Sequence, residues 1–196
     1  YAVDDMPEPG SLATVVYNYI YNGDVKKTTT ESSARVGREY PDVDLSGLPD
    51  FLAAEKPAGT VTAEGGTYDI ELKEALPFKT STDAAPIYYY LENVQGDGTR
   101  LYASSGLKFR TAEQASSVNE VRNDLWYVKG NVFDGFQFSS VAAGNLLHSS
   151  AVMSHVCALA FSGAAYNVST WDILATSDGW SVCPHAGEPK NIVGGK

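Results

Sequence analysis

Hydrophobic and polar residues alternate along several short stretches of this chain, which is the pattern of β-strands with one buried face. The first such stretch covers residues 13–21. One of its faces carries Val15, Tyr17, Tyr19 and Tyr21. Asn22-Gly23 then predicts a tight hairpin turn, and the Thr-rich residues 25–31 predict a return strand with exposed polar side chains. Two further short strands are predicted at residues 60–62 and 67–72.

A pattern of four short strands is repeated in the second half of the chain. Each copy reads as a strand, a turn containing glycine, two strands around a polar loop, and a closing strand that carries Trp. The strands predicted for the first copy are 88–94, 100–104, 107–110 and 125–128. Those predicted for the second copy are 136–140, 146–150, 158–161 and 171–174. A third, weaker copy begins at Gly179.

The phase of this repeat is set by its aromatic residues. Phe136 and Trp180 are 44 residues apart, and Trp126 and Trp171 are 45 residues apart. The other positions that correspond are Tyr89 with Phe136, Leu101 with Leu146, and Tyr102 with Leu147. Aromatic residues at equivalent positions fill a shared core, so Trp126, Trp171 and Trp180 are expected to be buried.

The repeat predicts an all-β fold. Three copies of this length suit a β-trefoil better than a propeller, because propellers have about four to eight blades. The third copy stops at Lys196 after two strands at most, so we expect an incomplete third lobe in a truncated chain. Its closing strands would follow Lys196 or be lent by the N-terminal module, because an open lobe leaves unpaired sheet edges.

Proline- and glycine-containing stretches divide the chain into parts. Residues 1–11 contain two prolines and several acids, which is typical of a linker. Residues 12–76 form a small, sheet-rich β-module, and residues 77–86 form a connector bounded by prolines. Residues 87–196 form the β-trefoil-like module. The boundary between the two modules is therefore expected near Pro77.

The charge of the chain limits its partners. The 14 Lys and Arg against 24 Asp and Glu give a formal net charge of −10, and the sequence pI is about 4.6. Nucleic acids and anionic lipid surfaces attract clustered basic residues, so we expect neither as a partner. No apolar run approaches the roughly 20 residues of a membrane span, so membrane insertion is not expected.

The N-terminal module resembles the mucin-binding-protein type repeats of bacterial surface proteins. The segments that carry the resemblance are, in order, VVYNYIYNGD, ARVGREYP, PAGTVTAEGG and YDIEL. The resemblance implies a β-grasp-like or sheet-rich module on a bacterial cell surface. The sequence departs from the family where LSGLPDFLAAE replaces the usual run toward a Gly-Tyr pair, which weakens any implied affinity for mucin.

The C-terminal module resembles the ricin-type β-trefoil lectins, and related segments occur in surface proteins of gut Bacteroidetes. The resemblance lies in the segment YYLENVQGDGTRLYAS. The usual Gln-x-Trp signature is absent, because Asp124-Leu-Trp126 and Ser169-Thr-Trp171 stand in its place. The resemblance implies a non-catalytic, adhesin-like protein that is extracellular or on the cell surface and binds host or dietary glycans.

The sequence contains no catalytic signature. It has no G-x-S-x-G turn for a nucleophilic serine, so we expect neither an enzyme nor a cofactor. Five residues that are typical zinc ligands lie within forty residues, but their spacing is not that of a zinc site, and no metal is expected. These residues are His148, His155, Cys157, Cys183 and His185. The two cysteines are expected to be buried thiols, with a disulfide as the alternative.

One turn combines the residue types that bind sugars. Gly96 and Gly98 flank Asp97, so this turn can present a carboxylate outward. Tyr102 follows on the next strand and is expected to point outward, because its neighbour Leu101 points inward. The predicted ligand-binding residues are Asp97, Tyr102, Asn93 and Arg100. An exposed Tyr beside hydrogen-bonding groups can stack on a sugar ring and bind its hydroxyls.

Two alternatives stay open. Tyr102 aligns with Leu147, so it can instead occupy a repeated packing position. The whole chain can likewise be a structural spacer or interaction module without a ligand of its own, since it carries no complete lectin signature.

Overall fold

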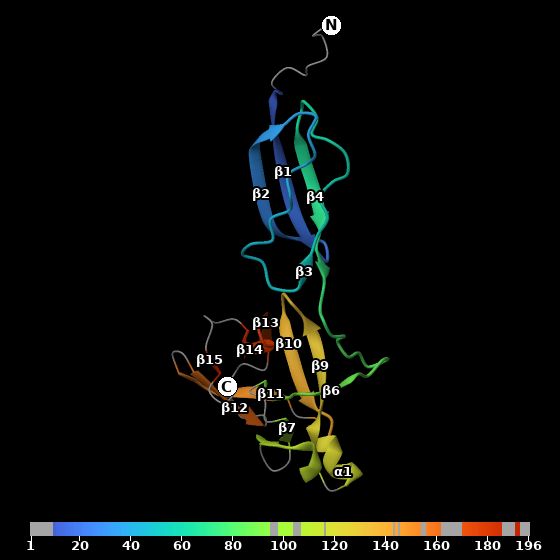
Figure 1. Ribbon diagram of the computed structural model, residues 1–196, viewed down its shortest axis with the longest axis vertical. Coiled ribbons are helices and arrows are strands. Elements are labelled where there is room, and N and C mark those ends of the chain that lie inside the picture. Colours follow the sequence, from blue (N-terminus) through green and yellow to red (C-terminus); the bar gives the residue numbers. More distant parts are fainter. Residues whose placement is uncertain are drawn as a thin grey trace, which may run out of the picture. The chain divides into compact units, whose positions relative to one another are not determined.

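The structure is a computed structural model of the chain that forms two compact units, residues 1–76 and 77–196, each described by itself below (Figure 1). The residues described are 10–94, 98–103, 107–115, 117–142, 144, 146–153, 156–161, 170–185 and 191–192. Strands dominate both units, and the longest helix of the described residues has four residues. The all-β prediction is therefore confirmed.

The first unit is built on a three-stranded sheet. Its strands are β1 (Leu12–Tyr21), β2 (Asp24–Arg35), β3 (Leu52–Ala53), β4 (Gly66–Glu71) and β5 (Lys73–Glu74). The order in the sheet is β2-β1-β4, with β2 antiparallel and β4 parallel to the central strand β1. Strands β3 and β5 form a separate antiparallel pair.

The predicted hairpin and its alternation are confirmed. Asn22 and Gly23 have φ values of 51° and 86°, as the two central residues of a type I′ turn require. Side chains at every second position of β1 are buried, whereas β2 is mostly exposed. The strand expected at residues 60–62 does not form, and Thr60 makes only an isolated bridge with Glu39. Val61 is nevertheless buried, so hydrophobicity there reflects packing of a loop.

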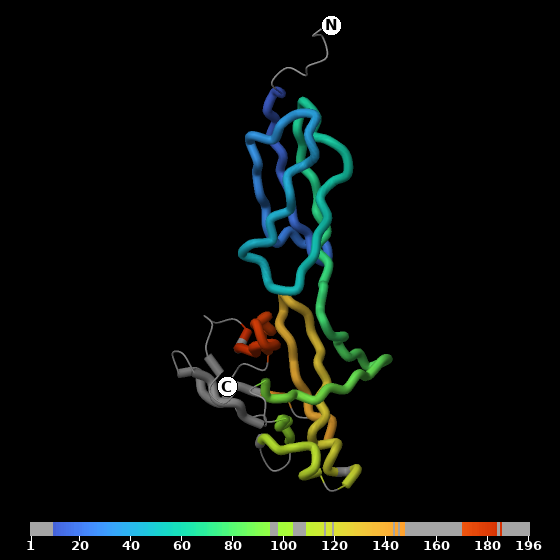
Figure 2. The backbone as a smooth tube through the Cα atoms, in the orientation of Figure 1, coloured from blue at the N-terminus to red at the C-terminus, as the bar shows by residue number. Residues whose placement is uncertain are grey.

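Tyrosine hydroxyls attach the long connection between β2 and β4 to the sheet. The Tyr17 hydroxyl donates to the Pro41 carbonyl at 2.8 Å, and the Tyr19 hydroxyl accepts from the backbone N–H of Asp44 at 2.7 Å. Burial raises the pKa of Tyr17. The connection can be followed beside the sheet in Figure 2. Buried tyrosines thus serve both as core residues and as hydrogen-bonding partners of a loop.

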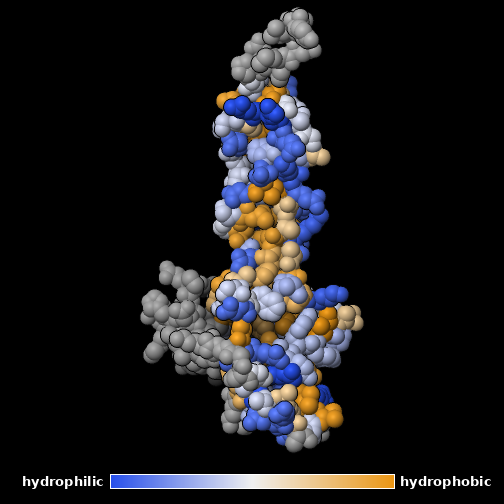
Figure 3. Space-filling model, in the orientation of Figure 1, coloured by the Kyte–Doolittle hydropathy of each residue, from blue (hydrophilic) through white to orange (hydrophobic). Residues whose placement is uncertain are grey.

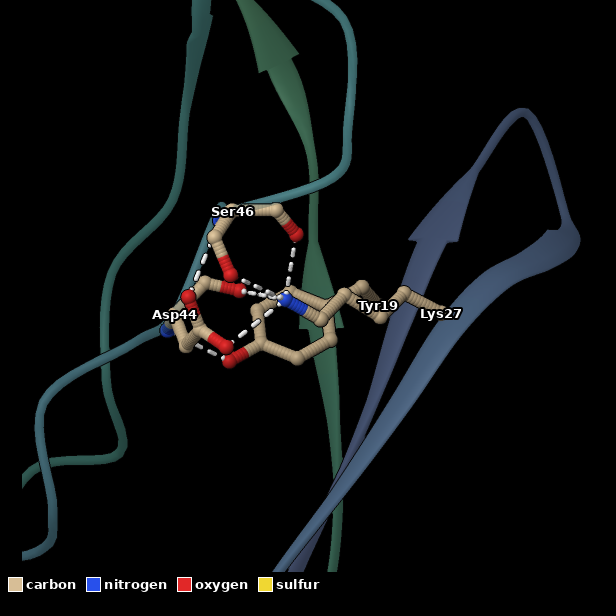
Figure 4. A network of polar contacts seen from close by, with 4 residues as sticks. All are labelled: Tyr19, Lys27, Asp44 and Ser46. Atoms are coloured by element: carbon tan, nitrogen blue, oxygen red, sulfur yellow. Dashed lines mark hydrogen bonds and ion pairs between the residues drawn. The ribbon is translucent and has the colours of Figure 1, made fainter.

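Lys27 on β2, the cross-strand partner of Tyr19, binds the same connection from the same face of the sheet (Figure 4). Its Nζ donates to the Asp44 carbonyl and to Asp44 Oδ2, both at 2.8 Å, and to the Ser46 carbonyl at 2.6 Å. The backbone N–H of Ser46 donates to Asp44 Oδ1 at 2.9 Å. The hydrogen bond from Lys27, with those from Ser46, holds the pKa of Asp44 well below its usual range.

The described residues of the second unit form ten strands. They are β6 (Tyr88–Tyr90), β7 (Arg100–Ala103), β8 (Leu107–Arg110), β9 (Leu125–Asn131), β10 (Gly135–Ser140), β11 (Leu147–Met153), β12 (Val156–Phe161), β13 (Trp171–Ala175), β14 (Trp180–Pro184) and β15 (Asn191–Ile192). Three single turns of helix lie between β8 and β9: η1 (Ala112–Gln114), α1 (Val118–Val121) and η2 (Arg122–Asp124). All eight strands predicted for the first two copies are present.

The pattern of strand pairing in the first copy is repeated in the second. A five-stranded sheet has the order β14-β13-β10-β9-β6, and each neighbouring pair is antiparallel. In the first copy the hairpin β7–β8 lies in sequence between the paired strands β6 and β9. In the second copy the hairpin β11–β12 lies between β10 and β13 in the same way. Strand β15 pairs in parallel with β12.

Two tryptophans occupy equivalent places in these copies. Trp126 is paired with Tyr89 across the sheet, and its indole N–H donates to the Leu101 carbonyl at 2.9 Å. Trp171 is paired with Phe136, and its indole N–H donates to the Leu147 carbonyl at 3.0 Å. Leu101 is therefore equivalent to Leu147. The alignment predicted from sequence was wrong by one residue there, because the turn after the first strand is one residue longer in the first copy.

The third tryptophan differs from the other two. Trp126 and Trp171 are both fully buried, as predicted, but 51% of Trp180 is exposed, so its predicted burial is wrong. Trp180 lies on the edge strand β14, and no strand of the described residues covers its outer side. A sequence repeat identifies equivalent positions, but burial also requires the neighbouring strand.

Phe78 contacts the equivalent aromatic residue of all three copies. Its ring centroid lies 6.2 Å from that of Tyr89, 5.7 Å from Phe136 and 6.4 Å from Trp180, each in an edge-to-face arrangement. The neighbouring Lys79 exchanges two backbone hydrogen bonds with the Tyr89 hydroxyl, at 2.9 and 3.0 Å. The segment 77–86, expected to be a connector, thus supplies a side chain that the three repeats share.

We expect acid to destabilise the first unit in part through Asp44. Because its folded-state pKa is lowered, Asp44 contributes stability above about pH 4, the usual pKa of an unfolded Asp, and this contribution is lost as the pH falls further. In the Asp44→Asn variant, the unfolding temperature of the first unit should fall less steeply between pH 4 and pH 2. NMR signals of β1 and β2 followed during heating would measure this. The exposed Glu64→Gln control should keep the original slope.

The buried indole groups of Trp126 and Trp171 should contribute more to the free energy of unfolding than the exposed indole group of Trp180. Trp126→Phe and Trp171→Phe each leave a buried carbonyl without its donor, so we expect each to lower the free energy of unfolding by about 1–3 kcal/mol. Trp180→Phe should change it by less than about 0.5 kcal/mol. All three tryptophans lie in the second unit, so tryptophan fluorescence during guanidinium denaturation reports on that unit in every variant. Equal losses in all three variants would contradict the assigned role of the indole hydrogen bonds.

Candidate functional site

The strand β7 presents two of the predicted site residues on one face. Leu101 and Ala103 are 4% and 1% exposed, whereas Arg100 and Tyr102, at the alternate positions, are half-buried. The predicted inward direction of Leu101 is confirmed. Because Leu101 is equivalent to Leu147, Tyr102 is equivalent to the residue after Leu147. The sequence alignment of Tyr102 with Leu147 is therefore wrong.

The turn before β7 brings a third predicted residue close to this strand. The backbone N–H of Asn93 donates to the Thr99 carbonyl at 2.9 Å, and Glu92 is bridged with Arg100. Asn93 therefore lies beside the start of β7. Asp97, the carboxylate expected at the tip of this turn, lies outside the described residues.

Arg100 is stacked on a tyrosine and paired with a carboxylate. Its guanidinium carbon lies 3.9 Å from the ring centroid of Tyr90, which is within the range of a cation–π contact. Its Nε donates to Glu92 Oε1 at 2.9 Å. The side chain of Arg100 is 23% exposed and Tyr90 is 42% exposed, so both remain accessible to a ligand.

Arg110 on β8 stands opposite Arg100 and has similar partners in a buried setting. Its guanidinium carbon lies 4.3 Å from the ring centroid of Tyr102. Its Nε donates to Asp124 Oδ1 at 2.9 Å, and its Nη2 donates to the Glu120 carbonyl at 2.7 Å. The side chains of Arg110 and Asp124 are only 10% and 2% exposed. This arginine therefore holds one face of the Tyr102 ring in place.

Together these side chains form a line along β6, β7 and β8 that we call the tyrosine–arginine row. Its members are Tyr88, Tyr90, Arg100, Tyr102 and Arg110. Tyr88 and Tyr90 share the exposed face of β6, and the ring of Tyr88 lies 5.0 Å from that of Tyr127 on β9. A hydrogen bond with Tyr88 raises the pKa of Tyr127.

The row offers aromatic rings, a partly exposed guanidinium and a carboxylate on one surface. Tyrosine rings can pack against the C–H face of a sugar, and the charged groups can bind its hydroxyls. Hydrophilic and hydrophobic residues are intermixed over the visible coloured surface of the second unit (Figure 3). Among the described residues of this unit, the exposed large hydrophobic ones are Tyr88, Tyr90, Val94, Phe109, Val118 and Trp180.

Sequence reasoning missed five residues of this site: Tyr88, Tyr90, Glu92, Arg110 and the buried Asp124. Alternation along β6 could have revealed two of them, since Tyr88 and Tyr90 both fall on the face opposite Tyr89. Arg110 and Asp124 approach Tyr102 only through strand pairing and the short helices before β9. Asp124 also occupies a place of the absent Gln-x-Trp signature, where it serves as the buried partner of an arginine.

The histidines and cysteines of the second unit are less fully described. The side chains of His148, His155 and Cys157 lie outside the described residues, and that of Cys183 is buried. His185 Nδ1 lies 2.7 Å from Asp172 Oδ1. In the part of the chain that the structure describes, no three His, Cys, Asp or Glu side chains gather as a metal site would require.

Comparisons with protein-family models, with curated proteins and with solved structures found no match for this chain. Within the described ranges, none of the helices has the length and apolar character needed to cross a bilayer. The resemblances to mucin-binding repeats and to ricin-type lectins therefore stay predictions.

The two arginines of the row should differ sharply in their effect on stability. Arg110→Leu leaves the buried Asp124 carboxylate without its counter-charge, and we expect a loss of about 3–5 kcal/mol in the free energy of unfolding. Arg100→Leu removes a partly exposed ion pair and should cost less than about 1 kcal/mol. Guanidinium denaturation followed by tryptophan fluorescence would compare them.

The double variant Arg110→Leu/Asp124→Leu serves as the matched control. Removing both charges should restore a large part of the stability lost in Arg110→Leu alone, because no unpaired charge is left buried. Equal costs for the Arg100 and Arg110 variants would contradict the structural role assigned to Arg110.

Proposed function

We propose that this chain is a non-catalytic, carbohydrate-binding and adhesin-like part of a bacterial cell-surface or secreted protein. The observation that carries the proposal is the tyrosine–arginine row. There Tyr90 is 42% exposed, and Arg100 is held against its ring by the bond to Glu92. Both the ring and the guanidinium are oriented before any ligand arrives, which lowers the entropy lost on binding.

The arrangement of strands supports a lectin-like fold for the second unit. A β-trefoil contains three copies of a first strand, a hairpin and a last strand, and it joins the last strand of each copy to the first strand of the next. The series β6, β7–β8, β9 followed by β10, β11–β12, β13 has this order, and β14 begins the third copy. The parallel neighbours β1 and β4 of the first unit are compatible with a β-grasp-like module.

The ligand that the row suits is a glycan of host or dietary origin. Tyr90 supplies the ring for stacking, and Arg100, Glu92 and Asn93 supply donors and acceptors for hydroxyl groups. Asp97, which lies outside the described residues, stays the sequence-based prediction of a further carboxylate for this set. The net charge of −10 disfavours nucleic acid as the partner.

The alternative function is a structural spacer or interaction module without a ligand of its own. It is favoured by the contact between Arg110 and Tyr102, because one ring face is already covered by a guanidinium that a buried carboxylate holds. On that reading the row is a part of the packing between β6, β7, β8 and the helices before β9.

A glycan array that includes mucin O-glycans would separate these two functions. We expect binding to at least one glycan group, and calorimetry on that glycan should show affinity reduced by more than about tenfold in Tyr90→Ala and in Arg100→Ala. Val118→Ala changes a residue that is 83% exposed and outside the row, so it should bind as the original chain does.

The stability of each variant should be measured alongside its binding. Binding that is lost in Tyr90→Ala while the unfolding transition is unchanged supports the site. An array without a hit, or a glycan that binds Tyr90→Ala and Arg100→Ala at full affinity, refutes this site and leaves the spacer function.

A further inference from the structure

The chain enters and leaves the three-stranded sheet of the first unit through neighbouring strands. Strand β1 is the first strand of the described residues, and β4 is the last strand of this sheet before the chain continues toward residue 77. The two strands are parallel and lie side by side (Figure 1). The start of β1 and the end of β4 therefore lie at opposite ends of the same pair of strands.

Tension along the chain loads this pair lengthwise. A pull on the chain before Leu12 and after Glu71 draws the two strands past one another along their own direction. The hydrogen bonds of a parallel pair are evenly spaced along the strands, so they share the load and must yield together. The register contains six residue pairs, from Val15 opposite Gly66 to Ile20 opposite Glu71.

Side chains of both strands shield these hydrogen bonds on one face of the sheet. Val15, Tyr17 and Tyr19 of β1 are buried there, as is Ile70 of β4. Tyr17 and Tyr68 are opposite one another in the register, and their ring centroids lie 6.4 Å apart in an edge-to-face arrangement. A stretched hydrogen bond of this pair is therefore not readily replaced by water from that face.

Backbone contacts extend the pairing beyond both ends of the register. At the end of β4, the backbone N–H of Leu72 donates to the Ile20 carbonyl at 2.8 Å. Before the start of β4, Gly65 lies so close to β1 that an added Cβ would clash with the Thr14 carbonyl oxygen. The close approach of the two backbones thus requires a glycine at this position.

We propose that the first unit is a load-bearing link, in which the parallel pair of β1 and β4 keeps the unit folded while the chain is under tension. Forced unfolding is governed by the rate of unfolding. A pair of strands whose hydrogen bonds must break together has a high barrier to that step. This function is independent of the tyrosine–arginine row, so it applies to an adhesin and to a spacer alike.

Force spectroscopy on the complete chain, with two different pairs of anchors, tests the proposal. Both pairs share Ser11, which precedes β1. The second anchor is Ala75, after β5, in one chain and Glu64, before β4, in the other. All three residues are exposed and are replaced by Cys to carry the handles. In both chains Cys157→Ser and Cys183→Ser remove the cysteines of the second unit, which lies outside the loaded segment.

The two anchor pairs load the same hydrogen bonds in different directions. Between Ser11 and Ala75 the force acts along the strands, whereas between Ser11 and Glu64 it acts at one end of the pair and separates the strands step by step. At the same pulling speed, we expect a mean unfolding force at least about twofold higher between Ser11 and Ala75, because six residue pairs share the load instead of one. The released length, at most about 3.3–3.6 Å for each residue between the anchors, identifies complete unfolding.

A matched pair of glycine variants tests the close approach of the backbones. Gly65→Ala and Gly47→Ala replace glycines with similar φ values of 67° and 74°, but nothing lies within 4 Å of a Cβ added at Gly47. With the Ser11 and Ala75 anchors, Gly65→Ala should lower the unfolding force more than Gly47→Ala does. The comparison of the two anchor pairs decides the proposal even if Gly65→Ala does not fold.

Equal unfolding forces through the two anchor pairs would overturn the proposal, as would a higher force between Ser11 and Glu64. The unfolding temperature without force, followed by NMR signals of β1 and β2, should be the same in both anchored chains, so that only the direction of loading differs. A folded Gly65→Ala variant that resists force as well as Gly47→Ala would likewise contradict the role assigned to the β1–β4 pair.

Discussion

The hydrogen bonds of two buried indole groups fix the relation between the parts of the second unit. Trp126 and Trp171 each belong to the last strand of a repeat and donate to the backbone of the hairpin in that repeat, at Leu101 and Leu147. Each indole is fully buried, where a lost hydrogen bond is not replaced by water. The position of each hairpin relative to the five-stranded sheet is thereby determined.

The candidate site depends on this arrangement. Leu101 carries the carbonyl that Trp126 binds, and the neighbours of Leu101 on β7 are Arg100 and Tyr102. Fixing one residue of a short strand also fixes the direction of the residues beside it, because side chains alternate. Asp124, two residues before Trp126, then holds Arg110 against Tyr102. The orientation of the tyrosine–arginine row therefore depends on the buried contacts of Trp126 and Asp124.

In the first unit, polar side chains hold a long connection against the sheet. Its sheet has three strands, and the hydroxyls of Tyr17 and Tyr19 bind the backbone of the long connection that follows β2. Lys27 binds the same connection through three carbonyl and carboxylate oxygens. A tyrosine contributes a large apolar ring and a polar end, so it can be buried and still satisfy a loop.

The sequence by itself determined the elements: the hairpin at Asn22-Gly23, the eight strands of the two full repeats and the burial of Trp126 and Trp171. Alternation, turn residues and periodicity are local signals, and these elements follow from local rules. Only the tertiary structure decided the exposure of Trp180, the contact of Phe78 with three repeats, and the approach of Arg110 to Tyr102. Each of these depends on which strand lies beside which, and strand neighbours far apart in sequence are set by packing of the whole sheet.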